Sequence, residues 1–258
     1  MKPLSACPAF DEISSAFTHE IGVGLRMWMA IGRAVIVTGL SIPALAWAAD
    51  EVRAVSGFQA VALESPVKVK VSLAEQERVQ VSGPGKNHET VETVIENRKG
   101  VPTLVIRQKG WWFQRHADAV VTVQGPQFSA LGVAGSGTLE AQLSNQPSLL
   151  LQVAGSGDLN VKGLTANSVE VNVAGSGDVR VQGAAQNLKV NLAGSGDAWL
   201  NDLQGEDVAV HVAGSGDARV HARQRLRVSV AGSGDVRYSG PARDISSSVV
   251  GSGTVKRE

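Results

Sequence analysis

A short motif, Ala-Gly-Ser-Gly-Asp, places a hydroxyl beside a carboxylate and recurs through the second half of the chain. Serine and aspartate are residue types of hydrolase active sites, where one serine needs its own base and oxyanion site. The Gly-Ser-Gly copies begin at intervals of 18 to 20 residues, at Gly135, Gly155, Gly175, Gly194, Gly214, Gly232 and Gly251. Because seven equivalent serines are poor candidates for one catalytic centre, we predict a structural motif and no catalytic residue.

Five of these motifs continue with an aspartate, at Asp158, Asp178, Asp197, Asp217 and Asp235. Stacked carboxylates repel one another unless turn N–H groups, basic partners or a cation offset the charge. Arg180, Arg219 and Arg237 stand two residues further on and face the same way. Calcium binding is an alternative, but one aspartate per coil supplies few of the six to eight oxygen ligands that calcium takes. We therefore favour turn and ladder aspartates, with no metal site.

The residues around each motif predict the strands that position it. Apolar residues occupy alternate positions on both sides of the turn, as at Val169, Val171 and Val173 before it and Val179 and Val181 after it. A period of two is typical of a strand with one buried face. Glycine allows the positive φ that a tight corner requires.

The near-constant repeat length favours stacked parallel coils, with antiparallel hairpins as the alternative. In-register stacking would place Val173 between Val153 and Leu192. We predict an all-β fold, a single-stranded parallel β-helix (a solenoid) with coils of about 20 residues. Right-handed winding is expected, because parallel crossovers usually have that hand. The predicted corner residues are Gly135, Gly155, Gly175, Gly194, Gly214 and Gly232.

The chain divides into three parts by composition. Residues 131–258 hold the repeat, and 49–130 lack it but contain alternating segments such as Val67–Val71. We predict that 49–130 form an irregular β region that caps the solenoid, because an open terminal coil would be an edge strand prone to aggregation. Residues 1–48 are assigned to a leader.

The leader resembles a secretory signal peptide. An apolar run at 34–45 follows two arginines, and small residues precede the expected cleavage near Ala48. The run is shorter than the ~20 residues of a spanning helix, so we expect export, with no transmembrane segment in the mature chain; an uncleaved anchor is the alternative. The periplasm, the outer-membrane surface and the extracellular space all remain open. Residues ahead of the signal suggest translation from Met27 or Met29.

Charge and cysteine content exclude some classes of function. Basic and acidic side chains balance at 24 each, which gives no general attraction to nucleic acid. The one cysteine, Cys7, lies in the leader. The mature chain would therefore have no disulfide and no cysteine-ligated metal, and no cofactor is expected.

Candidate ligand-binding residues lie where the repeat pattern is broken. Trp111, Trp112 and Phe113 stand together outside the repeat, and exposed aromatic side chains often anchor sugars or protein partners. Adjacent strand residues point to opposite sides, so one tryptophan is expected to be exposed. Packing against the end of the helix and membrane contact are the other interpretations.

Two further candidates interrupt regular rows of the repeat. Trp199 takes the place of an arginine two residues after Asp197, and His211 belongs to a polar row. That row faces away from the valines and consists of Gly132, Gln152, Asn172, Asn191, His211, Ser229 and Ser248. It could hold an extended sugar by serial hydrogen bonds, or it is the solvated side of a sheet.

The combination of Gly57-Phe58, a strand at Val67–Val71 and serial Val-Ala-Gly-Ser-Gly-Asp units resembles the bacterial autotransporter adhesin head domain, or GIN domain, a domain of unknown function. The resemblance covers about residues 52–257. It implies an exported β-helical protein and, loosely, adhesion. It supplies no catalytic residues.

We therefore predict a non-enzymatic β-helical protein of the cell envelope, with a binding, adhesion or structural role. A glycan or a surface protein is the expected partner, and the oligomeric state stays open. A polysaccharide-active enzyme is the alternative, because parallel β-helices often host such enzymes. An enzyme site should interrupt the repeat with a unique acid–base cluster or a long loop, and no inserted loop occurs in 130–258.

Overall fold

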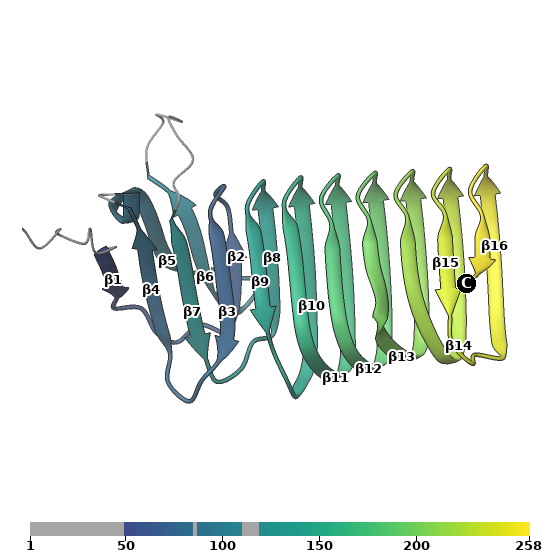
Figure 1. The fold of residues 1–258 in the computed structure, drawn as a ribbon, viewed down its shortest axis with the longest axis horizontal. Coiled ribbons are helices and arrows are strands. Elements are labelled where there is room, and N and C mark those ends of the chain that lie inside the picture. Colours follow the sequence, from purple (N-terminus) through teal and green to yellow (C-terminus); the bar gives the residue numbers. More distant parts are fainter. Residues whose placement is uncertain (1–48, 85–86, 110–118) are drawn as a thin grey trace, which may run out of the picture. The chain divides into compact units, whose positions relative to one another are not determined.

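The computed structural model describes residues 49–84, 87–109 and 119–258 (Figure 1). The leader, with its predicted cleavage site and Cys7, lies outside the described residues, as do Trp111, Trp112 and Phe113. Within the described part of the chain, no helix is long and apolar enough to span a membrane.

The described residues form strands and one short 3-10 helix. The N-terminal elements are β1 (Ala49–Arg53), β2 (Ala60–Leu63), β3 (Lys68–Leu73), β4 (Arg78–Gly83), η1 (Asn87–Thr90), β5 (Val91–Arg98), β6 (Val101–Gln108) and β7 (Val120–Gly125). The repeat contains β8 (Ala130–Gly135), β9 (Thr138–Gln142), β10 (Gln146–Gly155), β11 (Asp158–Gly175), β12 (Val179–Gly194), β13 (Ala198–Gly214), β14 (Ala218–Gly232), β15 (Val236–Ser239), β16 (Asp244–Gly251) and β17 (Val255–Arg257).

The repeat forms a parallel β-solenoid with coils of about 20 residues, which confirms the predicted fold class. Each strand of the repeat pairs in parallel with the same part of the next coil (Figure 1). Val173 pairs with Val153 on one side and with Leu192 on the other, as predicted. The hairpin alternative is wrong, because the strands on the two sides of a Gly-Ser-Gly turn pair with neighbouring coils and not with each other.

Alternate side chains from both arms of each coil fill the interior. Val169, Val171 and Val173 in the arm before a turn are buried, as are Val179 and Val181 in the arm after it. Stacking these positions in register joins the apolar faces of all coils into one continuous core. A single coil could not bury this face alone, so each coil depends on its neighbours.

The corners of the solenoid require glycine for two reasons, and Gly175 shows both. Its φ is 127°, a region that residues with a Cβ rarely adopt. A Cβ at Gly175 would also collide with the carbonyl oxygen of Gly155 in the preceding coil. The carbonyl of Gly175 in turn accepts N–H bonds from Ser195 at 2.8 Å and Gly196 at 3.0 Å.

The N-terminal region stacks in an order that differs from the order of the sequence. β2 pairs in parallel with both β6 and β8, and β3 pairs in parallel with both β7 and β9. The earlier coil, β2–β3, is therefore inserted between the β6–β7 coil and the first Gly-Ser-Gly coil. Antiparallel pairs of β4 with β1 and β7, and of β5 with β6, complete this region. The sequence did not predict this insertion.

We expect Gly175→Ala to lower the free energy of unfolding by about 3 kcal/mol, because alanine is strained at this φ and its Cβ has no room beside Gly155. Denaturant unfolding of the purified variant measures the change. Gly132→Ala is the matched control, because a Cβ there meets its nearest atoms at 3.9 Å without a positive φ. The control should stay within about 0.5 kcal/mol of the parent. Equal losses in both variants would contradict the close approach at the corner.

Candidate functional site

One outward face of the solenoid carries side chains aligned in rows across the coils. It is formed by the arms that follow the Gly-Ser-Gly turns. In β11, for example, Leu159 and Val161 point inward, and Asn160 between them points outward. Strand register places equivalent outward positions side by side in neighbouring coils. We call this surface the turn-following face, and it bears three rows.

The three rows follow from the strand pairing. The Asp row contains Lys68, Thr138, Asp158, Asp178, Asp197, Asp217, Asp235 and Thr254. The middle row contains Thr122, Lys70, Glu140, Asn160, Arg180, Trp199, Arg219, Arg237 and Lys256. The third row includes Ser72, Gln142, Lys162 and Gln182.

Backbone N–H groups of the next coil compensate the carboxylates of the Asp row. The N–H of Asp217 donates to Asp197 Oδ1 at 2.9 Å, and that of Asp235 donates to Asp217 Oδ1 at 2.9 Å. Asp178 accepts the N–H of Asp197 at 3.3 Å. The donors come from the turn of the neighbouring coil. Among the described residues, no three His, Asp or Glu side chains converge as a metal site would require.

Few arginines of the middle row pair with the Asp row. Arg180 lies 3.3 Å from Asp178 in its own coil. Arg219 lies instead 3.8 Å from Glu258. The arginines of the middle row therefore lie beside the carboxylates of the Asp row, but the ion pairs between the two rows do not repeat from coil to coil.

Trp199 lies between two arginines of the middle row. The guanidinium carbon of Arg219 is 4.4 Å from the centre of the indole ring, and that of Arg180, in the coil on the other side, is 5.7 Å away. Both distances are in the range of cation–π attraction. The indole Nε1 is buried without a hydrogen-bond partner among the described residues. The guanidinium groups thus compete with any ligand for the ring faces of Trp199.

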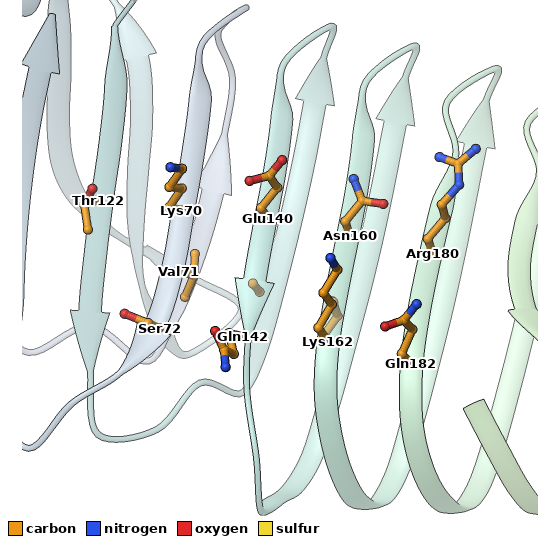
Figure 2. A pocket seen from close by; sticks show the side chains of 12 residues that line it. Lys70, Val71, Ser72, Thr122, Glu140, Gln142, Asn160, Lys162, Arg180 and Gln182 are labelled. Carbon is orange, nitrogen blue, oxygen red and sulfur yellow. The ribbon is translucent and has the colours of Figure 1, made fainter. Parts of the chain in front are cut away.

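A groove of about 780 Å³ lies on this face (Figure 2). Its lining side chains come from β7, β3, β9, β11 and β12, which lie side by side (Figure 2). The polar lining consists of Lys70, Ser72, Thr122, Glu140, Gln142, Asn160, Lys162, Arg180 and Gln182. The apolar lining residues Val71, Ala141 and Val161 are at most 5% exposed, so the exposed side chains of the groove are those of its polar and charged residues.

The charges of the groove are unevenly paired. Glu140 forms an ion pair with Lys68 at 2.7 Å, and Arg180 forms an ion pair with Asp178. Lys70 and Lys162 have no ion-pair partner among the residues that the structure describes, and both are exposed. The groove therefore presents two ammonium groups to solvent.

The structure separates the candidate residues that the sequence suggested. Trp199 adjoins Arg180 at the edge of the groove, whereas His211 is exposed in the arm that precedes a turn. In that polar row, Asn191 Nδ2 donates to Asn172 Oδ1 at 2.7 Å. Ligand binding by Trp199 and His211 stays a prediction, as it does for the aromatic residues outside the described part.

Sequence reasoning missed most of the groove. Lys70 and Glu140 meet only because β3 is inserted beside β9, and no repeat spacing predicts this pairing. The alternation of Val67–Val71 did place Lys68 and Lys70 on one outward side. The repeat spacing also placed Asn160 and Arg180 in one row, two residues after Asp158 and Asp178.

The fold and the stacked corner motif define this chain as a parallel β-solenoid. It belongs to the family described as "Putative auto-transporter adhesin, head GIN domain", whose model matches residues 57–242. The resemblance inferred from the sequence is thereby confirmed. A search of the curated proteins found no match.

Several solved structures share this fold. A protein described as a putative adhesin from Bacteroides fragilis is 20% identical, with a TM-score of 0.74 over 82% of this chain and 97% of that one. One described as a putative lipid binding protein from Parabacteroides distasonis is 20% identical, with a TM-score of 0.62 over 81% and 96%. A putative adhesin from Parabacteroides merdae is 17% identical, with a TM-score of 0.60 over 81% and 95%. At these identities the likeness shows the fold alone.

The C-terminal end of the Asp row has a shifted pKa. A hydrogen bond from the Thr254 hydroxyl to Asp235 Oδ1, at 2.8 Å, and a second from its backbone N–H, at 2.9 Å, hold the pKa of Asp235 below its usual range. A carboxyl whose pKa is lower when folded adds stability above its unfolded pKa. That stability is lost as the pH falls through the folded pKa.

We expect Thr254→Val to raise the pKa of Asp235 toward its usual value, because the hydroxyl bond is the largest cause of the shift. The backbone N–H remains, so part of the shift should persist. A ¹³C NMR titration of the carboxyl group measures it. Thr138→Val makes the same substitution near the opposite end of the row and should leave the pKa of Asp235 unchanged. An unaltered Asp235 pKa in Thr254→Val would show that the hydroxyl bond does not lower it.

Proposed function

We propose that this chain is an exported, non-enzymatic protein of the cell envelope that binds a glycan or surface protein through the groove of the turn-following face. Membership of an adhesin-type family supports a binding or adhesion role. Export is supported by the signal-like leader ending near Ala48.

The observation that carries this proposal is the set of amide side chains that successive strands place in two adjacent rows of a preformed groove. Gln142, Asn160 and Gln182 lie on three neighbouring strands (Figure 2). Neighbouring strands are about 4.8 Å apart, and amides both donate and accept hydrogen bonds. Strand pairing holds their backbones in place, so little ordering is required when a ligand binds. Such an arrangement suits an extended ligand with repeating hydrogen-bonding groups.

The composition of the groove supports binding without turnover. Glycoside hydrolysis uses a pair of carboxyl groups, one on each side of the scissile bond. Of the described residues that line the groove, Glu140 alone carries a carboxylate, and that carboxylate is paired with Lys68. The serines of the turns are equivalent repeat positions at exposed corners. Release of oligosaccharide from a bound polymer would contradict this part of the proposal.

Two other sets of residues are secondary parts of the proposal. Trp111 and Trp112 are proposed as ligand anchors on the basis of residue type. The polar row that contains His211 offers a second set of serial hydrogen-bonding groups. The experiment that follows separates both from the groove.

We expect the triple variant Gln142→Ala, Asn160→Ala and Gln182→Ala to bind isolated cell envelopes at least about tenfold more weakly than the parent, because three hydrogen-bonding groups are lost without a change of charge. Sedimentation of labelled protein with envelopes measures the affinity.

The matched control, Asn167→Ala with Gln186→Ala, removes exposed amides outside the groove and outside the polar row, and it should bind like the parent. A separate variant, Asn172→Ala with Asn191→Ala, tests the polar row. A further variant, Trp111→Ala with Trp112→Ala, tests the aromatic anchors. Undiminished binding by the groove variant, or an equal loss in the control, would refute the groove as the binding site.

A further inference from the structure

The unpaired charges of the groove indicate the chemistry of its ligand, provided that the groove is the binding site proposed above. Lys70 on β3 and Lys162 on β11 are separated by the single strand β9. Their backbones are therefore about 10 Å apart across the sheet, with an offset of two residues, about 7 Å, along the strands. Neither has an ion-pair partner among the described residues, and the one lining carboxylate, Glu140, is already bound by Lys68. An anionic ligand would offset the repulsion between these cations.

On two strands of the groove, β9 and β3, the Asp row contains no aspartate. In the repeat, an aspartate stands beside the middle row in five consecutive coils. On the N-terminal side of Asp158, the adjacent strand β9 carries Thr138 at this position, and β3 beyond it carries Lys68. Asp158 itself begins β11, four residues before Lys162 and therefore about 13 Å away along the strand. The two free ammonium groups thus lie where the negative row ends.

The surface of the groove does not suit a lipid chain. An acyl chain packs against apolar side chains, but Val71, Ala141 and Val161 are at most 5% exposed, and the accessible carbon atoms of the groove belong mainly to polar and charged side chains. Without exposed apolar side chains, the groove also offers a poor site for the aromatic or aliphatic anchors of a protein partner. The accessible groups are amides, hydroxyls and cations, which match sugar hydroxyls and acidic substituents.

We infer that the groove binds a linear acidic polysaccharide whose carboxylate or sulfate groups lie against Lys70 and Lys162. The sugar hydroxyls bind the amides of Gln142, Asn160 and Gln182. The chain of sugars crosses the strands, because the two cations and the three amides are distributed over successive coils (Figure 2). The ring faces of Trp199 are occupied by arginines, so binding depends on charge more than on stacking.

The test measures binding of the full chain to four probes: polygalacturonate, dextran sulfate, neutral dextran and vesicles of anionic phospholipid. We expect binding to one or both acidic polymers, none to neutral dextran, and weakening as salt is raised. Binding to polygalacturonate alone indicates carboxylate recognition, and binding to dextran sulfate alone indicates sulfate recognition.

The double variant Lys70→Gln with Lys162→Gln should bind the acidic polymer about tenfold more weakly. Lys99→Gln with Lys189→Gln is the matched control. It removes the same net charge away from the groove, including the Lys189 that pairs with Glu170 at 3.1 Å. Thermal unfolding of each variant confirms that it is folded.

Equal weakening in the groove variant and the control would overturn the inference, as would tighter binding to vesicles or equal binding to neutral dextran. The failure of this inference is distinguishable from the failure of the proposed function. If the amide variant loses envelope binding while the lysine variant keeps it, the groove is the site but its ligand is not acidic. If neither variant loses envelope binding, both proposals fail.

Discussion

Backbone hydrogen bonding between equivalent glycines of successive coils is the constraint on which the structure depends. The carbonyl of Gly155 accepts N–H bonds from Ser176 at 2.8 Å and Gly177 at 3.0 Å. This approach leaves no space for a Cβ at Gly175. A shift of one corner relative to the next would break these bonds. The arm that follows each corner therefore begins in register with the equivalent arm of the preceding coil.

Register at the corner explains how one interior and one ordered surface arise together. A strand that slipped by one residue would exchange its buried and exposed sides. The fixed corner therefore keeps the valines inside and aligns the polar residues outside in rows. The Asp row uses this alignment directly, since Asp197 accepts the N–H of Asp217 only when the two coils are in register. A surface with this order suits the binding of a ligand that itself repeats.

The repeat pattern was sufficient to predict much of this arrangement. The position of Val173 between Val153 and Leu192 followed from spacing and strand periodicity, and the pairing confirms it. The groove could not be predicted in the same way. It depends on β3 lying beside β9, a pairing between a coil outside the repeat and the first coil within it. The sequence also did not predict the environment of Trp199, because the position of a residue in a row does not show which side chains contact its ring.

The sequence by itself determined the all-β class, the coil length, the corner glycines and the family, because each of these depends on local periodicity or on a recurring motif. Only the tertiary structure decided which unlike segments became neighbours. It inserted β2 and β3 between later strands, and it thereby brought Lys70 close to Glu140 and Lys162. The physical reason is that pairing between non-repeated strands depends on the global packing of their apolar faces, and no interval along the chain records that packing.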